Sequence, residues 1–202
     1  MENSEVDKGR RRFLIGATSV VGAVGTAAAA APFLISWNPS ERAKAAGAPV
    51  EINLSKVQEG QLVRVIWRKK PVWIVNRTQQ MLDDLSSVEN LLRDPASAVE
   101  QQPAYAQNSA RTREGKEKYL VLIGICTHLG CSPTFRPELG APDLGGKDWK
   151  GGWYCPCHGS RFDMAGRVYK NVPAPTNLEV PVYSFKDDNT VIIGLDENGE
   201  AV

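Results

Sequence analysis

All four cysteines and both histidines of this 202-residue chain lie in two short segments. The first segment, GICTHLGCSPTF, contains Cys126, His128 and Cys131, and the second, WYCPCHGSRF, contains Cys155, Cys157 and His158. Each segment offers at least one thiolate and one imidazole, spaced as C-x-H in the first and C-x-x-H in the second. Thiolates and imidazoles bind soft and borderline metal ions. The fold of this chain should therefore bring the two segments together around a common centre.

Two kinds of metal centre fit one cysteine and one histidine from each segment. Such a set can hold a tetrahedral zinc ion. It can also hold a [2Fe–2S] cluster in which one iron keeps two cysteines and the other takes two histidines. Neither set needs Cys131 and Cys157, and a disulfide between them would pin the segments together across a cluster, whereas a zinc site seldom needs such a link. A thioredoxin-like redox pair is disfavoured because Cys155-Pro156-Cys157 is one residue shorter than C-x-x-C.

An uncharged run, Phe13–Trp37, directly follows a basic cluster at residues 8–12. As a helix rising about 1.5 Å per residue, this run would be roughly 37 Å long, enough to cross a hydrocarbon core of about 30 Å. We expect a transmembrane anchor over residues 13–37, with residues 1–12 in the cytoplasm by the positive-inside rule. The order Arg10, Arg11, any residue, Phe13, Leu14 resembles a twin-arginine export signal. Cleavage within Ala27–Ala31 is the alternative.

From Val50 onward the chain carries short alternating or β-branched runs separated by turn-forming residues, which predict β-strands. The runs are VEINL, LVRVIW, PVWIVNR, YLVLIGI, LEVPVYSF and TVIIGL, and the second and third should form a hairpin. They predict an antiparallel β-sandwich or small barrel over residues 51–202. One interruption, QQMLDDLSSVENLLRD, predicts a helix that packs on the sheet and ends by Pro95. Residues 38–50, which lack apolar periodicity, predict a tether.

The charge distribution argues against a nucleic-acid partner. Residues 1–40 hold four of the 24 Lys and Arg and three of the 23 Asp and Glu, so the rest of the chain is neutral. A neutral head lacks the basic surface that binds a phosphate backbone.

The motifs CTHLGC and CPCHGS together resemble the double signature of the Rieske iron–sulfur proteins. The order of export signal, anchor, tether, β head, two cysteine loops and a PAPTNLEVP segment resembles the iron–sulfur subunits of proteobacterial ubiquinol–cytochrome c reductase, the cytochrome bc complex. This resemblance covers nearly the whole chain. It implies one N-terminal transmembrane helix and an all-β, antiparallel Rieske-type head, with a small cluster-binding subdomain at about residues 124–175 and a short helical insertion.

The resemblance also implies which residues hold the cofactor, one [2Fe–2S] cluster per chain. Cys126 and Cys155 would bind the buried iron, and His128 and His158 the outer iron. The other two cysteines would form the disulfide that is characteristic of the high-potential members. Ser160 resembles the hydroxyl of the family that donates to a bridging sulfide.

The implied activity is that of an electron-transfer subunit of quinol–cytochrome c oxidoreductase. His158 would hydrogen-bond the quinol and take its proton, while Leu129 and Gly130 would dock on cytochrome b. The electron would pass to a c-type cytochrome within a dimeric complex. The chain would cross the bacterial inner membrane once, in contact with its lipid, and hold its head in the periplasm. The alternative is the Rieske small subunit of a periplasmic molybdenum oxidase such as arsenite oxidase.

Two features depart from the family pattern. Phe162 stands where many respiratory members have a tyrosine whose hydroxyl bonds a ligand cysteine, which predicts a lower reduction potential. The stretch RPELGAPDLGGKDWKG, residues 136–151, lies in a segment that is longer than in mitochondrial-type members. Because it is polar and rich in glycine, we expect a surface insertion. Trp149 and Trp153 should pack there as core residues.

Overall fold

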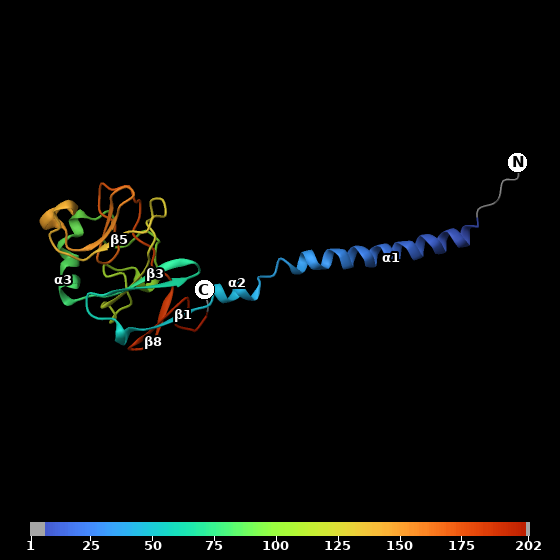
Figure 1. Ribbon diagram of the computed structural model, residues 1–202, viewed down its shortest axis with the longest axis horizontal. Helices are drawn as coiled ribbons and strands as arrows, with labels where there is room; N and C mark the ends of the chain where they lie inside the picture. The colour runs from blue at the N-terminus through green and yellow to red at the C-terminus, as the bar shows by residue number, and fades with distance from the viewer. Residues whose placement is uncertain (1–6, 201–202) are drawn as a thin grey trace. The chain divides into compact units, whose positions relative to one another are not determined.

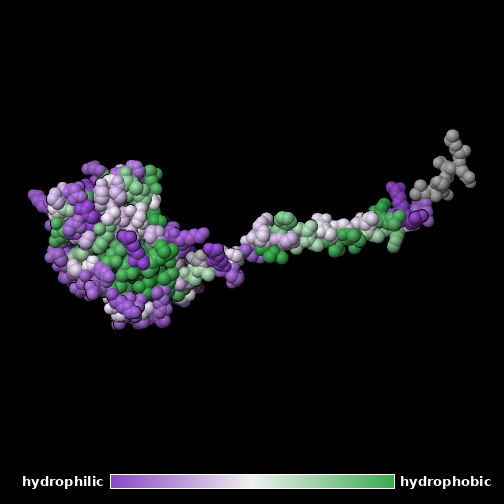
Figure 2. Space-filling model, in the orientation of Figure 1, coloured by the Kyte–Doolittle hydropathy of each residue, from purple (hydrophilic) through white to green (hydrophobic). Residues whose placement is uncertain are grey.

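The computed structural model describes residues 7–200 of the chain (Figure 1). The chain divides into two units, with the boundary between Ala45 and Ala46. The first unit contains helix α1 (Lys8–Ile35), which begins inside the basic segment and is capped by the Asp7 carboxylate. This helix is long enough and apolar enough to cross a membrane. Figure 2 shows apolar surface along its length and hydrophilic residues at its N-terminal end.

Part of the predicted tether is helical. A short helix, α2 (Glu41–Ala46), begins after Ser40, whose hydroxyl accepts a hydrogen bond from the Ala43 N–H at 3.2 Å. Lys44 and Glu41 form an exposed ion pair one turn apart on this helix. The first strand of the head then begins at Val50.

Within residues 7–200, nine strands form three antiparallel sheets of three strands each, which confirms the predicted all-β class. The first sheet has the order β1 (Val50–Asn53), β9 (Thr190–Ile193) and β8 (Tyr183–Asp187). The second has the order β2 (Leu62–Trp67), β3 (Lys70–Asn76) and β4 (Tyr119–Ile123). The third has the order β5 (Thr134–Arg136), β6 (Gly152–Cys155) and β7 (Ser160–Asp163).

The predicted hairpin is confirmed as β2 and β3. Its two-residue turn, Arg68 and Lys69, has φ values of 48° and 63°, the left-handed conformation that matches the twist of paired strands. The run LEVPVYSF was expected to be one strand, but β8 begins only at Tyr183. Pro181 has no N–H for a ladder, and the Val180 N–H donates instead to the Gln101 carbonyl at 2.9 Å.

The predicted helix is shorter than its apolar pattern. Helix α3 (Gln79–Ser87) is capped by Thr78 and gives way to the 3-10 turn Glu89–Leu91. The hydroxyls of Ser86 and Ser87 donate to carbonyls three residues earlier, and such bonds weaken a helix at its end. The apolar stripe nevertheless packs on the core as expected, with Leu85, Val88 and Leu92 buried.

The long insertion is more than a surface loop. Trp149 is fully buried, as the sequence predicted, but Ala141 and Leu144 are buried with it. Two 3-10 turns, Pro142–Leu144 and Gly146–Asp148, bring these side chains to the core. The insertion thus lies at the surface with Trp149 in the core, as expected, and Ala141 and Leu144 are buried apolar residues that the sequence analysis did not name.

Buried arginines hold the segment that follows β7. Arg167 forms a fully buried ion pair with Asp163 at 2.7 Å and also donates to the Leu85 carbonyl at the end of α3. Arg77 and Arg111 donate to the carbonyls of Met164 and Ala165 in the same segment. Burial lowers the pKa of both Arg77 and Arg111 to about 10, so both stay charged at neutral pH. No periodicity in the sequence indicated this cluster.

Candidate metal centre

The two cysteine- and histidine-bearing segments form neighbouring loops with the same turn. The first loop, residues 124–133, lies between β4 and β5, and the second, residues 156–159, joins β6 to β7. The Gly130 N–H donates to the Cys126 carbonyl at 3.0 Å, and the Gly159 N–H donates to the Cys155 carbonyl at 2.9 Å. Both glycines have a left-handed φ, 81° and 78°, which a residue with a Cβ rarely adopts. Each loop thus closes four residues after its first cysteine.

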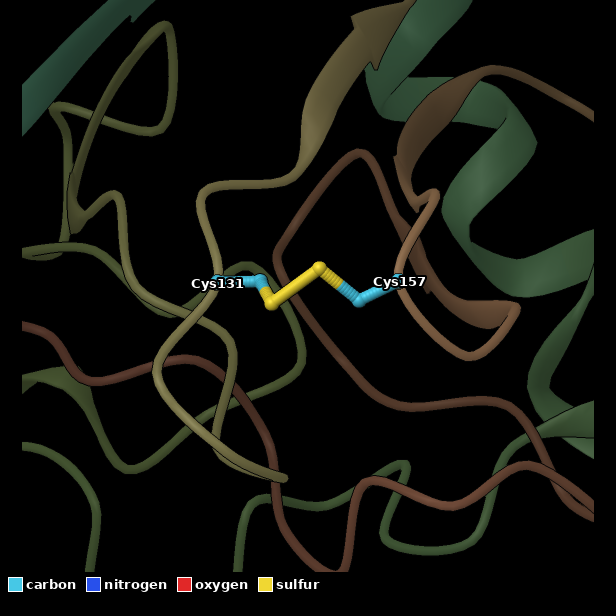
Figure 3. The surroundings of a disulfide bond; sticks show 2 residues. All are labelled: Cys131 and Cys157. Atoms are coloured by element: carbon cyan, nitrogen blue, oxygen red, sulfur yellow. A yellow bond between two sulfur atoms is a disulfide. The ribbon is translucent and has the colours of Figure 1, made fainter.

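The structure sorts the four cysteines into two pairs. Cys131 and Cys157 form a disulfide that links the two loops (Figure 3), which confirms the predicted bond. Cys126 and Cys155 are free thiols, each 2% exposed. The sulfur atoms of Cys131, Cys155 and Cys157 lie within 4.8 Å of one another, but the two disulfide sulfurs cannot act as thiolates. The two buried thiols are therefore the cysteine ligands that these loops can offer.

Cys155 lies in surroundings that disfavour a free thiolate. Burial raises the pKa of the Cys155 thiol, and the neighbouring Cys126 raises it further. A thiol in such a site loses its proton readily only when a cation compensates the charge. The pair therefore fits a bound metal better than a reactive cysteine.

The two imidazoles meet at the outer end of the loops. The ring centroids of His128 and His158 are 4.8 Å apart, and their planes are nearly perpendicular at 87°. His128 is half-buried and His158 is exposed. Leu129, 70% exposed, and Gly130 lie beside them in the first loop and leave an apolar side chain facing solvent.

A third loop, residues 172–177, supports both cysteine loops from behind. The Ala174 N–H donates to the hydroxyl of buried Ser160 at 3.0 Å, which leaves the Ser160 O–H proton for another acceptor. The Thr127 hydroxyl donates to the Thr176 carbonyl at 2.8 Å. Arg93 holds the third loop by donating to the Val172 carbonyl at 3.1 Å. The sequence analysis did not name Thr127 or Arg93. Thr127 has no metal-binding group, and Arg93 lies 33 positions before the first cysteine.

Two buried thiols behind two adjacent imidazoles fit a [2Fe–2S] cluster, and the free Ser160 proton supplies a donor beside them. The same four donors could in principle hold zinc. Comparison with known proteins separates the two interpretations.

Two family models match the chain. The model "Ubiquitinol-cytochrome C reductase Fe-S subunit TAT signal" matches residues 1–40, and the model "Rieske [2Fe-2S] domain" matches residues 49–184. The cofactor of the head is therefore a [2Fe–2S] cluster, and the alternative of a zinc site is wrong. The N-terminal match also confirms the twin-arginine signal.

The relatives agree with the family models. The ubiquinol–cytochrome c reductase iron–sulfur subunit of Allochromatium vinosum is 60% identical over 196 residues, covering 97% of this chain and 93% of that protein. The corresponding subunit of Blastochloris viridis is 46% identical over 185 residues, covering 92% of each. A chain of a structure described as "Hyperthermophilic respiratory Complex III" is 26% identical, covers 89% of this chain and 98% of its own, and has a TM-score of 0.48.

None of these matches supports the alternative of a molybdenum-oxidase subunit. The identity of 60% extends over nearly the full length of both proteins, so the signal, the helix and the head all match the same family. The chain belongs to the Rieske iron–sulfur subunits of ubiquinol–cytochrome c reductase.

Proposed function

We propose that this chain takes one electron from a quinol, with a proton passing to His158, and delivers the electron to a c-type cytochrome of the same complex. The observation that carries the proposal is the pairing of two buried free thiols with two imidazoles at the solvent-facing end of the head. A cluster that exchanges electrons with partner proteins needs one side near the protein surface. A cluster that is stable in water needs its other side buried in the protein.

In the proposed ligand set, Cys126 and Cys155 hold the inner iron, and His128 and His158 hold the outer one. When bound, the cluster supplies a carrier for one electron at a time. Neutral imidazoles in place of two thiolates leave less negative charge at the centre, which favours potentials of about −150 to +300 mV over the roughly −400 mV of plant-type ferredoxins. Ser160 would add to this effect, because its free hydroxyl proton stabilises nearby negative charge.

His158 is the better candidate for the proton because it is exposed, whereas His128 is half-buried. Its imidazole has two nitrogens, so one can bind iron while the other holds or releases a proton toward the quinol oxygen. Leu129, with 70% of its surface exposed, directly follows His128 in the first loop and offers an apolar contact for cytochrome b. Gly130 adds no side chain and lets the partner approach the loop backbone.

An apolar helix long enough to cross a membrane lies in the region that matches the twin-arginine signal, which fits a membrane-anchored subunit. We propose residues 1–12 as the cytoplasmic segment, 13–37 as the anchor, 38–50 as the tether and 51–202 as the periplasmic head. The basic residues before the apolar run support this orientation. Assembly as a dimeric complex with cytochrome b, in contact with membrane lipid, completes the proposal.

Electron paramagnetic resonance of reduced membranes, with and without an inhibitor of the quinol site, tests this function. We expect a cluster signal whose line shape changes when the inhibitor binds, because His158 would lose its quinol partner. A His158→Gln variant should lose the signal, and Thr190→Ser, far along the chain on β9, should keep it. A signal that ignores the inhibitor would contradict quinol oxidation while leaving the cofactor in place.

A further inference from the structure

The two cysteine loops are joined at their outer ends by the disulfide, and a pair of stacked tryptophans lies at their bases. Trp73 on β3 and Trp153 on β6 stack with ring centroids 5.7 Å apart and planes only 2° from parallel. Both side chains are buried, with 1% and 0% exposed. Because β3 and β6 belong to different sheets, the stack connects the sheet that leads into the first loop with the sheet that carries the second.

Trp73 also touches the chain where the first loop begins. Gly124 directly follows β4 and stands two residues before Cys126. A Cβ at Gly124 would lie 2.4 Å from Cε2 of Trp73 and 2.7 Å from both Cζ2 and Nε1. Non-bonded carbon atoms approach to about 3.5–4.0 Å, so the indole ring occupies the space of the missing side chain. The Gly124 N–H donates to the Pro71 carbonyl at 2.8 Å, which fixes the backbone against the same strand.

Trp153 holds the matching position in the strand that leads into the second loop. It lies two residues before Cys155 on β6, so its side chain and that of Cys155 point to the same face of the strand. A shift of one ring against the other would therefore move the start of one loop relative to the start of the other. The buried thiols of Cys126 and Cys155 are the groups whose separation this movement would change.

We propose that Trp73 is a positioning residue for the cluster: by packing against Gly124 and stacking on Trp153, it sets the separation of Cys126 and Cys155. Glycine is required at position 124 because the indole ring leaves no room for a Cβ. Its φ does not lie in the left-handed region, so backbone conformation is not the reason. This proposal rests on the ligand set proposed above. The geometry of the ligands determines how charge is shared with the cluster, so a shift of one loop should appear in its spectrum and potential.

The test uses the complex in membranes and two substitutions that oppose each other. Gly124→Ala adds a methyl group where the indole lies, and should shift the g values and the midpoint potential of the cluster or prevent its assembly. Trp73→Leu removes the three ring atoms that this methyl group would meet. Trp73→Leu alone should shift the g values and the midpoint potential, because the stack on Trp153 is lost. The double variant Gly124→Ala/Trp73→Leu should resemble Trp73→Leu alone, because the added methyl group no longer meets the ring.

Trp149→Leu is the matched control. Trp149 is also fully buried and stacks on Tyr169, with ring centroids 5.9 Å apart. Among the described residues, it stacks on no ring of the strands that lead into the two cysteine loops. It should lower the melting temperature without moving the g values. The proposal is overturned if Gly124→Ala or Trp73→Leu alone leaves both spectrum and potential unchanged. A wild type without an iron signal would instead overturn the proposed function, so the two failures are distinguishable.

Discussion

Replacing Phe162 by tyrosine should raise the reduction potential of the cluster. Strands β6 and β7 pair with Trp153 opposite Phe162 and Cys155 opposite Ser160. Opposed residues of antiparallel strands share a face, as do residues two apart along a strand, so Phe162 and Cys155 are diagonal neighbours on one face. Diagonal neighbours lie about 7–8 Å apart, within reach of an aromatic side chain. We therefore expect a hydroxyl at the tip of this ring to reach the Cys155 sulfur and donate to it.

The size of the effect follows from the strength of the added hydrogen bond. A hydrogen bond to a charged acceptor contributes about 1.5–3 kcal/mol. Only the part that differs between the oxidised and reduced states changes the potential, and half of the total is about 0.8–1.5 kcal/mol. Since about 59 mV corresponds to a tenfold change in the equilibrium constant for one electron, or about 1.4 kcal/mol, we expect a rise of about 30–65 mV.

A redox titration followed by electron paramagnetic resonance measures this rise. Phe162→Leu, which keeps the site apolar, should stay near the wild-type potential, and Phe185→Tyr, on β8 of another sheet, should leave it unchanged. Phe162 is fully buried, so the melting temperature of each variant must be recorded to exclude a general loosening of the fold. An intact spectrum with no rise in the Phe162→Tyr variant would refute the reasoning.

Further predictions concern the disulfide, the buried ion pair, the docking surface and the tether. Replacing Cys131 and Cys157 by serine should lower the free energy of unfolding by about 3–4 kcal/mol, the value for closing a loop of 26 residues, and urea denaturation that shows no loss would contradict this. Asp163→Asn leaves the buried guanidinium of Arg167 with only the half-exposed Glu89 carboxylate, 3.7 Å away, and should lower the same free energy by up to about 3–5 kcal/mol, as seen by calorimetry; a loss below about 1 kcal/mol would show that the pair is dispensable. Leu129→Ala removes an exposed apolar contact of about 1–2 kcal/mol and should slow quinol oxidation about 5- to 30-fold while the cluster signal persists; unchanged turnover would rule out the docking role. A run of prolines over residues 43–46 should slow electron delivery to the cytochrome in flash kinetics, and an unaltered rate would remove the need for a moving head.

The sequence predicted the parts of the fold that repeat a pattern. Strands such as β3 and β4 alternate or carry β-branched residues over five or more positions, so their type was clear. Strands β5, β6 and β7 have only three or four residues, including Gly152 and Cys155, and no alternation distinguished them from loop. The end of α3 was missed because two serine hydroxyls, and not Pro95, end the helix.

The candidate site was predictable to the extent that residue type and spacing define it. The cysteine and histidine residues could be named from the motifs, and the disulfide followed from the resemblance. The supporting contacts could not be named, since Trp73 lies 53 positions before Cys126, and Arg93 reaches the Val172 carbonyl across 79 positions. Such contacts depend on how the three sheets pack, which no local pattern reveals.

The central claim is that two imidazoles, His128 and His158, hold one iron of the cluster. Pulsed electron paramagnetic resonance on the reduced complex, with histidine labelled by nitrogen-15, tests it directly, because the chain contains only two histidines. We predict strong coupling of the electron spin to one nitrogen from each of two labelled imidazoles. Coupling to one imidazole, or to none, would contradict the proposed ligand set.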